Sequence, residues 1–228
     1  QKRGNVSTVD VSNAFRVETV SPNFFVLDYG QLAKTQGDFG KKRPISDIFE
    51  ELLREDYRGG IFMRQTFRLR ERIPLMLVME RSAETCFVNG TRVAFAPSSF
   101  DINFVEADLT DCVRAGENEL VYALHFAQHE GVRFALFDPE ATESLRNCLY
   151  YDVSLENAYL KGDFTVDERG VLEKPRKALT LGSDLYQKGY PFFKGEYTLR
   201  GKIAWKGNGK AVLQVAGRYH VAELYING

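Results

Sequence analysis

The sequence lacks an excess of charge of either sign, a long apolar run and closely spaced cysteines. Its 30 Lys and Arg residues nearly balance 31 Asp and Glu residues. This balance argues against a nucleic-acid or anionic-membrane partner, because both require excess positive charge. No apolar stretch is long enough to cross a bilayer. Cys86, Cys112 and Cys148 suit neither a metal motif nor a disulfide framework, so we expect reduced thiols, which slightly favours the cytoplasm over secretion.

What the chain does contain is typical of an antiparallel β-sandwich. It has 228 residues, 44% of them hydrophobic, with 17 Phe and 11 Tyr, and these aromatic residues favour strands. Residues 74–80 form a continuous apolar run suited to a strand buried on both faces, and residues 119–126 alternate cleanly. Asn89-Gly90 is a strong signal for a β-hairpin, because both residues tolerate positive φ. We therefore predict an all-β jelly-roll sandwich.

One short helix is expected among the strands. Asp47 can act as its N-cap, and Glu50 three residues later can close a capping box. Apolar side chains at residues 48, 49, 52 and 53 share one face, and Gly59-Gly60 is expected to end the helix. Residues 132–137 are predicted as a strand, and residues 138–146 as a further short helical segment.

An internal repeat divides the chain. The segment Tyr-Arg-Gly-Gly-Ile-Phe-Met-Arg at residues 57–64 is similar to Phe-Lys-Gly-Glu-Tyr-Thr-Leu-Arg at residues 193–200. Each segment leads to an Asn-Gly pair, at residues 89–90 and 227–228. We therefore expect two domains: residues 1–172 with the helix and the first sandwich, and residues 173–228 with the opening strands of a second, truncated sandwich.

Two motifs carry a resemblance to a known class of domain. Phe-Val-Asn-Gly at residues 87–90 is followed by Ala-Asp-Leu-Thr-Asp-Cys-Val-Arg-Ala-Gly-Glu-Asn-Glu-Leu at residues 107–120. This series resembles the galactose-binding-like jelly-roll domains of multidomain glycoside hydrolases, such as family 2 β-galactosidases and α-L-rhamnosidase-type enzymes. The segment Gly-Tyr-Pro-Phe at residues 189–192 resembles the start of the next sandwich in rhamnosidase-like hydrolases.

The resemblance implies a non-catalytic accessory region of a glycoside hydrolase. Its partner would be the catalytic domain of the same polypeptide, and it would also contact oligo- or polysaccharide. Those enzymes carry catalysis in a separate barrel, so no catalytic residue can be assigned here. Two other interpretations remain open: an independent carbohydrate-binding module, and a protein-interaction sandwich such as an adhesin segment.

Carbohydrate binding requires an exposed aromatic ring flanked by polar groups. The best candidates are Tyr190, Phe192 and Phe193, because Gly189 and Pro191 place them in a loop. Tyr150 and Tyr151 are a second pair of candidates. For each of these residues, the alternative is packing within the core or between domains.

Neither a metal nor a cofactor is expected, although clustered acidic residues leave one alternative. Asp108 and Asp111 could hold a structural Ca²⁺, but capping and solvation explain them better, as they do Asp101 and Glu106. His125 and His129 are four residues apart, yet His125 is expected on a strand, where this spacing does not build a zinc site.

Overall fold

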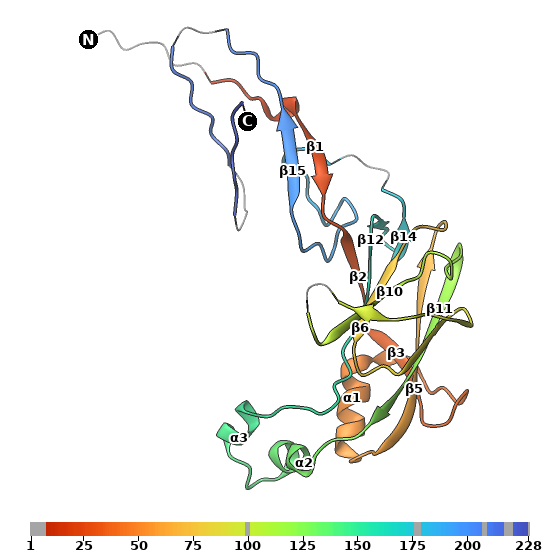
Figure 1. Ribbon diagram of the computed structural model, residues 1–228. Coiled ribbons are helices and arrows are strands. Elements are labelled where there is room, and N and C mark those ends of the chain that lie inside the picture. The colour runs from red at the N-terminus through yellow and green to blue at the C-terminus, as the bar shows by residue number, and fades with distance from the viewer. Residues whose placement is uncertain (1–7, 99–100, 176–178, 207–208, 217–220, 228) are drawn as a thin grey trace.

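A computed structural model describes residues 8–98, 101–175, 179–206, 209–216 and 221–227. Two β-sheets pack around one hydrophobic core, to which both sheets contribute buried side chains. A separate two-stranded ribbon extends away from this sandwich (Figure 1). The all-β sandwich predicted from the sequence is therefore confirmed.

The first sheet has five strands in the order β2-β12-β6-β10-β9. Its central strand carries Leu77, Val78 and Met79, each at most 2% exposed, which confirms the predicted burial on both faces. The strands are β2 (Asn23–Leu27), β6 (Met76–Glu80), β9 (Ala96–Pro97), β10 (Phe104–Asp108) and β12 (Ala158–Gly162).

The second sheet has the order β13-β14-β5-β11-β7-β8, with β3 also paired to β5 and β4 to β3. The long strands β5 and β11 pair antiparallel over their full length, and Ile61 and Leu120 on them are completely buried. The strands are β3 (Tyr29–Ala33), β4 (Arg43–Pro44), β5 (Gly59–Leu69), β7 (Thr85–Val88), β8 (Thr91–Arg92), β11 (Gly116–Phe126), β13 (Thr165–Val166) and β14 (Val171–Glu173).

The hairpin predicted at Asn89-Gly90 joins β7 to β8. Val88 pairs with Thr91, and the two turn residues have φ angles of 50° and 81°. This is the two-residue turn that the Asn-Gly signal predicts.

The helices differ in part from the prediction of one short helix and a further helical segment at residues 138–146. Helix α1 (Ile45–Arg54) begins before Asp47, at a Pro44 N-cap that makes no side-chain capping bond, so the predicted capping box is wrong. The start is set instead by the backbone N–H of Ile45, which donates to Asp28 O at 2.9 Å. Gly59 opens β5, four residues beyond the C-cap of the helix.

Two further helices form an arm that extends from the sandwich between β11 and β12 (Figure 1). Helix α2 (Glu130–Phe137) replaces the strand predicted there, because Val132 and Ala135 are buried at helical spacing. Helix α3 (Glu143–Asn147) overlaps the C-terminal half of the predicted helical segment and ends one residue beyond it, and Thr142 caps it. In the described part of the chain, none of the helices has the length and apolarity needed to span a bilayer.

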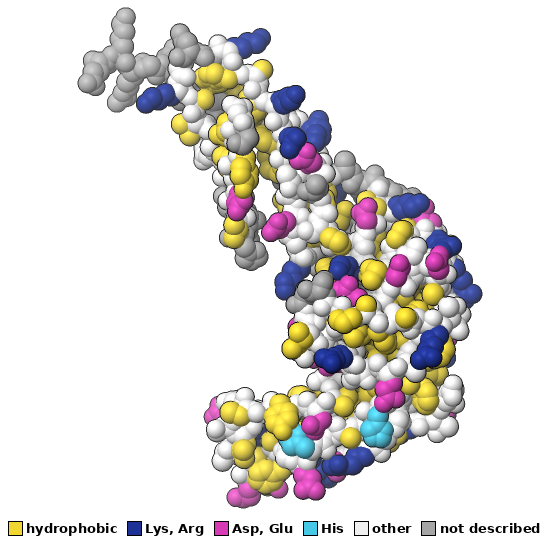
Figure 2. Space-filling model, viewed as in Figure 1, with side chains coloured by type: hydrophobic (Ala, Val, Ile, Leu, Met, Phe, Trp, Pro, Cys, Tyr) yellow, Lys and Arg dark blue, Asp and Glu magenta, His cyan; other side chains and the backbone are white. Residues whose placement is uncertain are grey.

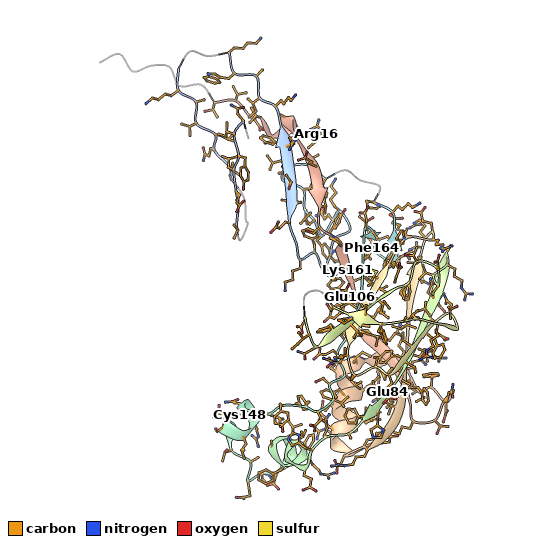
Figure 3. All side chains as sticks on the ribbon, viewed as in Figure 1. Arg16, Glu84, Glu106, Cys148, Lys161 and Phe164 are labelled. Carbon is orange, nitrogen blue, oxygen red and sulfur yellow. The ribbon has the colours of Figure 1, made fainter. Side chains whose placement is uncertain are left out.

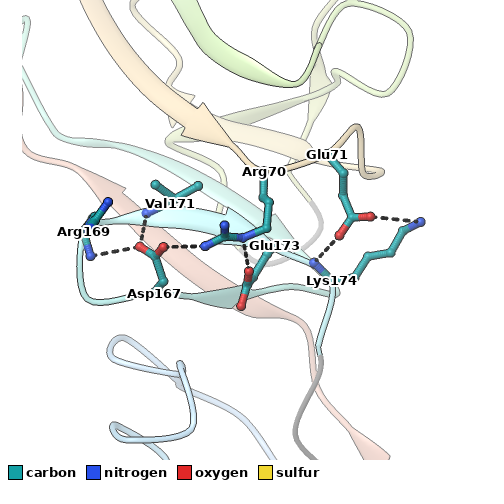
Figure 4. A network of polar contacts seen from close by, with 7 residues as sticks. All are labelled: Arg70, Glu71, Asp167, Arg169, Val171, Glu173 and Lys174. Atoms are coloured by element: carbon teal, nitrogen blue, oxygen red, sulfur yellow. Dashed lines mark hydrogen bonds and ion pairs between the residues drawn. The ribbon is translucent and has the colours of Figure 1, made fainter.

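Arg70, just beyond β5, ties this strand to the β13–β14 hairpin (Figure 4). Its guanidinium pairs with Asp167, at 2.8 Å, and with Glu173. Asp167 in turn accepts the backbone N–H groups of Arg169 and Val171, both at 2.9 Å. Charge-assisted hydrogen bonds thus stabilise the C-terminal end of the first sandwich.

The three cysteines are free thiols, as predicted. Cys86 is completely buried on β7, and burial raises the pKa of its thiol to about 12. A thiol that stays protonated is a poor nucleophile, so Cys86 contributes to packing.

The remaining strands, β1 (Phe15–Val20) and β15 (Tyr197–Gly201), form an antiparallel ribbon. A short 3₁₀ helix (Ser12–Ala14) precedes β1. The ribbon joins the N-terminal segment to the segment that the sequence assigns to a second domain.

Candidate functional site

The two motifs behind the family resemblance meet in one hydrogen-bonded cluster. Asn118 is fully buried, and its side-chain oxygen accepts the amide of Asn89 and the backbone N–H of Arg114, both at 2.8 Å. Asn89 also donates to Cys112 O at 2.9 Å and accepts from Glu119 N at 3.0 Å. The asparagines therefore hold the hairpin against the turn that precedes β11, which is a structural role.

The predicted aromatic loop packs more deeply than expected. Tyr190 is 7% exposed and makes an edge-to-face contact with Phe193, with ring centroids 5.8 Å apart. Phe192 is 46% exposed and contacts Phe25 edge-to-face at 6.1 Å. Of the three predicted residues, Phe192 has the most open ring, whereas the burial of Tyr190 fits the packing alternative.

Gly189 anchors this loop to the first sandwich. The amide of Asn23, which is 1% exposed, donates to Gly189 O at 3.1 Å and to Phe164 O at 3.0 Å. The backbone N–H of Val166 also donates to Gly189 O, at 2.9 Å. The segment predicted to open a second sandwich is thus fixed to strands of the first.

A different aromatic residue, Tyr150, presents a ring with a fixed orientation. Tyr150 is 66% exposed and stacks on the imidazole of His129, with centroids 4.6 Å apart and an interplanar angle of 22°. His129 donates its backbone N–H to Asp152 Oδ2 at 2.6 Å, and its Nδ1 lies 2.9 Å from the same oxygen. Hydrogen bonding from His129 lowers the pKa of the Asp152 carboxyl. An exposed ring beside a carboxylate and an imidazole can stack on an apolar sugar face and bind hydroxyl groups.

The Tyr150 cluster lies at the base of the helical arm. Gln128 donates to Val153 O and accepts the backbone N–H of Asp152 at 2.9 Å. These bonds connect the segment that enters the arm to the segment that returns from it. Sequence reasoning included Tyr150 but missed His129 and Asp152 as its partners. These two residues are 23 positions apart, and only the tertiary structure brings them together.

The acidic residues first considered for calcium serve the surrounding turns. Asp108 accepts the backbone N–H of Thr110 at 2.8 Å, and Asp111 pairs with Arg72 at 2.6 Å. Among the described residues, no group of three or more acidic, His or Cys side chains could hold a metal ion. His125 lies on β11, as expected.

The other two acidic residues considered from the sequence, Asp101 and Glu106, also make hydrogen bonds within the fold. Asp101 accepts the backbone N–H of Asn103 at 2.8 Å. Glu106 accepts the Ser98 hydroxyl at 3.1 Å and lies 3.5 Å from the Lys161 ammonium (Figure 3). Asp101 therefore caps a turn, as the sequence favours, whereas Glu106 is largely buried and paired with Lys161 instead of solvated.

A carboxyl group that the sequence did not single out, Glu80, lines a small cavity with Tyr122 and Glu156. Burial raises the pKa of Glu80 to about 7, and the charges of Glu156 and Asp101 add to the effect. A buried carboxyl with a raised pKa can act as a general acid. However, the cavity has a volume of about 10 Å³, which holds roughly one water molecule and no sugar ring.

Glu80→Gln should therefore change how stability depends on pH. Because the folded-state pKa of Glu80 is about 7 against 4.5 for the ordinary carboxyl, the wild-type protein loses stability as the pH rises from about 4.5 to 7. Allowing for solvent screening, we expect the variant to gain about 1 kcal/mol relative to the wild type between pH 5 and pH 8. Urea unfolding at both pH values measures this, with the exposed Glu84→Gln as control. An equal pH dependence in wild type and Glu80→Gln would refute the assignment.

Comparisons with known proteins leave the family open. No family model and no curated protein matches the sequence. Among solved structures, a β-glucuronidase from Ruminococcus gnavus is similar over 67% of this chain and 33% of its own, at 15% identity and a TM-score of 0.41. A β-D-glucuronidase from Dictyoglomus thermophilum is similar over 66% and 31%, at 15% identity and a TM-score of 0.40. The chain thus spans about a third of the length of these enzymes.

Proposed function

We propose that this chain is an accessory β-sandwich region of a glycoside hydrolase, which supports the catalytic domain of the same polypeptide and contacts carbohydrate. The observation that carries the proposal is the Asn89–Asn118 hydrogen bond. It joins the two motifs on which the family resemblance rests, although they are 29 residues apart. Because one asparagine from each motif is needed for this bond, both motifs would be expected together in domains of this kind.

The proposed arrangement has two parts. Residues 1–172 would form a galactose-binding-like jelly roll, and residues 173–228 would begin a second sandwich. The anchoring of Gly189 by Asn23 and Val166 supports a fixed junction between the two parts. A fixed junction is what a supporting role requires, because it transmits the position of one domain to the next.

Carbohydrate contact is proposed first at Tyr150. Its ring is held by His129 and stays 66% exposed, so little conformational freedom would be lost on binding. Asp152 and the imidazole Nε2 supply polar partners for hydroxyl groups. Within the predicted loop of Tyr190, Phe192 and Phe193, the partly exposed Phe192 is the residue proposed to contact sugar.

Tyr150→Ala should weaken binding of the chain to a responsive oligosaccharide about tenfold, because it removes the stacking ring. Titration calorimetry against a panel of oligosaccharides measures this effect. Tyr186→Ala is the matched control, since Tyr186 is 73% exposed. Phe192→Ala tests the second surface. Equal losses in the Tyr150 and Tyr186 variants, or no binding by the folded wild type, would reject carbohydrate contact at Tyr150.

The accessory role has a separate test. The chain alone should not hydrolyse nitrophenyl β-galactoside, β-glucuronide or α-L-rhamnoside. Hydrolysis by the purified chain would contradict the accessory role. High affinity of the chain alone for one sugar would instead favour an independent carbohydrate-binding module. A chain that binds no sugar but binds a protein would favour a protein-interaction sandwich.

A further inference from the structure

The segment that follows β15 exposes many large apolar side chains (Figure 2). Each is between 45% and 92% exposed, whereas a soluble protein rarely leaves so many apolar groups together in water. A surface of this kind indicates that something packs against it. The residues are Ile203, Trp205, Val212, Val215, Val221, Leu224, Tyr225 and Ile226.

The internal repeat shows what covers the equivalent residues in the first sandwich. Asn227 has a φ of 58°, close to the 50° of Asn89, so the two Asn-Gly motifs share a backbone conformation at the asparagine. With these asparagines aligned, Leu224 and Ile226 match Cys86 and Val88. Both residues of the first copy are completely buried, because β7 pairs with β11.

The repeat extends to β15, which matches β5. With Gly195 aligned on Gly59, Ile203 and Trp205 correspond to Phe67 and Leu69. Phe67 and Leu69 are 3% and 2% exposed, whereas Ile203 and Trp205 are 45% and 60% exposed. The side chains that form one face of the core in the first copy thus lie open in the second.

The pairing along one edge of the strand and the position of an arginine are also repeated. Strand β5 pairs with β3 along one edge and with β11 along the other, and β15 pairs with β1 along one edge. On β5, Arg64 bonds Gln31 of β3 and lies 3.7 Å from Glu119 of β11. The equivalent Arg200 pairs with Glu18 of β1 at 3.1 Å. A strand in the place of β11 would meet Arg200 and Lys202, so acidic side chains would suit its outer face.

We propose that β15 and residues 221–226 form an acceptor for one β-strand that has alternating apolar residues on its inner face and acidic residues on its outer face. The strand would stand between β15 and residues 221–226, and it would come from the second sandwich of the same polypeptide. The sheet order would be β1, β15, the added strand and residues 221–226, which repeats the order β3-β5-β11-β7. The inference rests on the two-sandwich arrangement proposed above.

The chain supplies both a probe and a reporter for this acceptor. A synthetic peptide with the sequence of β11, residues 116–126, has the required alternation and carries Glu117 and Glu119. Trp205 is the single tryptophan of the chain and lies four residues beyond β15, in the exposed apolar segment that leads to residues 221–226. Adding the peptide to the intact chain should shift the Trp205 emission to shorter wavelength in a saturable manner, because the strand excludes water from the indole.

Two variants and a control peptide make the test decisive. Ile226→Asp should abolish the shift, whereas Ile102→Asp, at an apolar residue that is 81% exposed on the first sandwich, should leave it unchanged. A peptide of the same composition without alternation should not bind. No shift with the β11 peptide, or an equal shift with the control peptide, would overturn the proposal. A concentration-dependent dimer that Ile226→Asp abolishes would also overturn it, in favour of pairing between two copies. The oligosaccharide titration is independent of every one of these outcomes.

Discussion

Asn118→Ala should lower the free energy of unfolding by about 3 kcal/mol, since it leaves buried polar groups without partners. The substitution removes the acceptor of the Asn89 amide and of the Arg114 N–H. It also removes the donor to Arg114 O and Gly116 O, at 2.8 and 3.1 Å. Asn118 is fully buried, so its replacement by Ala leaves a cavity as well as unpaired groups, even though Arg114 and Gly116 are exposed.

Urea unfolding followed by circular dichroism measures the effect as a lower midpoint at an unchanged m-value. The control is Asn147→Ala, because Asn147 is an exposed asparagine at the end of α3. Equal midpoints for the two variants would mean that the asparagine cluster does not stabilise the sandwich. The structural explanation of the family resemblance would then fail with it.

Gly189→Ala should destabilise the chain by about 2 kcal/mol and release the aromatic loop. Gly189 has a φ of 89°, a conformation that residues with a Cβ rarely adopt. An added Cβ would also lie 2.7 Å from Thr165 Cβ and 3.0 Å from the backbone N and O of Val166. Because backbone atoms cannot move aside easily, the loop would have to leave its anchor.

Hydrogen exchange at the Val166 N–H, which donates to Gly189 O, reports this release directly. Gly182→Ala is the matched control: Gly182 has a φ of 78°, but an added Cβ would meet no atom within 4 Å. Both variants carry the strain of positive φ, and only the Gly189 variant carries the steric clash. If both variants change exchange at Val166 equally, the anchoring of the loop at Gly189 is refuted.

The strands were predictable where side-chain alternation or a turn signal acted locally. Residues 119–126 alternate on β11, and the Asn-Gly hairpin forms where the sequence places it. The start of α1 was not predictable, because it depends on a hydrogen bond from the Ile45 N–H to Asp28 O, which is 17 residues away in the sequence. Helix α2 was predicted as a strand, since its aromatic and β-branched residues favour strands. In the folded chain, a helix buries Val132 and Ala135 together, which outweighs this local preference.

The candidate site was predicted only in part, because exposure is a tertiary property. The sequence selected Tyr190, Phe192 and Phe193 from their place in a loop, yet Tyr190 is 7% exposed. Tyr150 was a second choice, and nothing in its neighbourhood along the chain indicated that His129 would support its ring. The elevated pKa of Glu80 likewise depends on its burial in the folded chain and on the charge of Glu156, which is distant in sequence.

The sequence by itself determined the β-rich composition, the hairpin at Asn89-Gly90, the balanced charge and the repeat between residues 57–64 and 193–200. These properties depend on local backbone preferences and side-chain patterns. The tertiary structure decided which aromatic rings stay exposed, that Asn89 reaches Asn118, and that Gly189 docks on the first sandwich. Such contacts join residues far apart along the chain, and the packing of the two sheets selects among the contacts that the sequence permits.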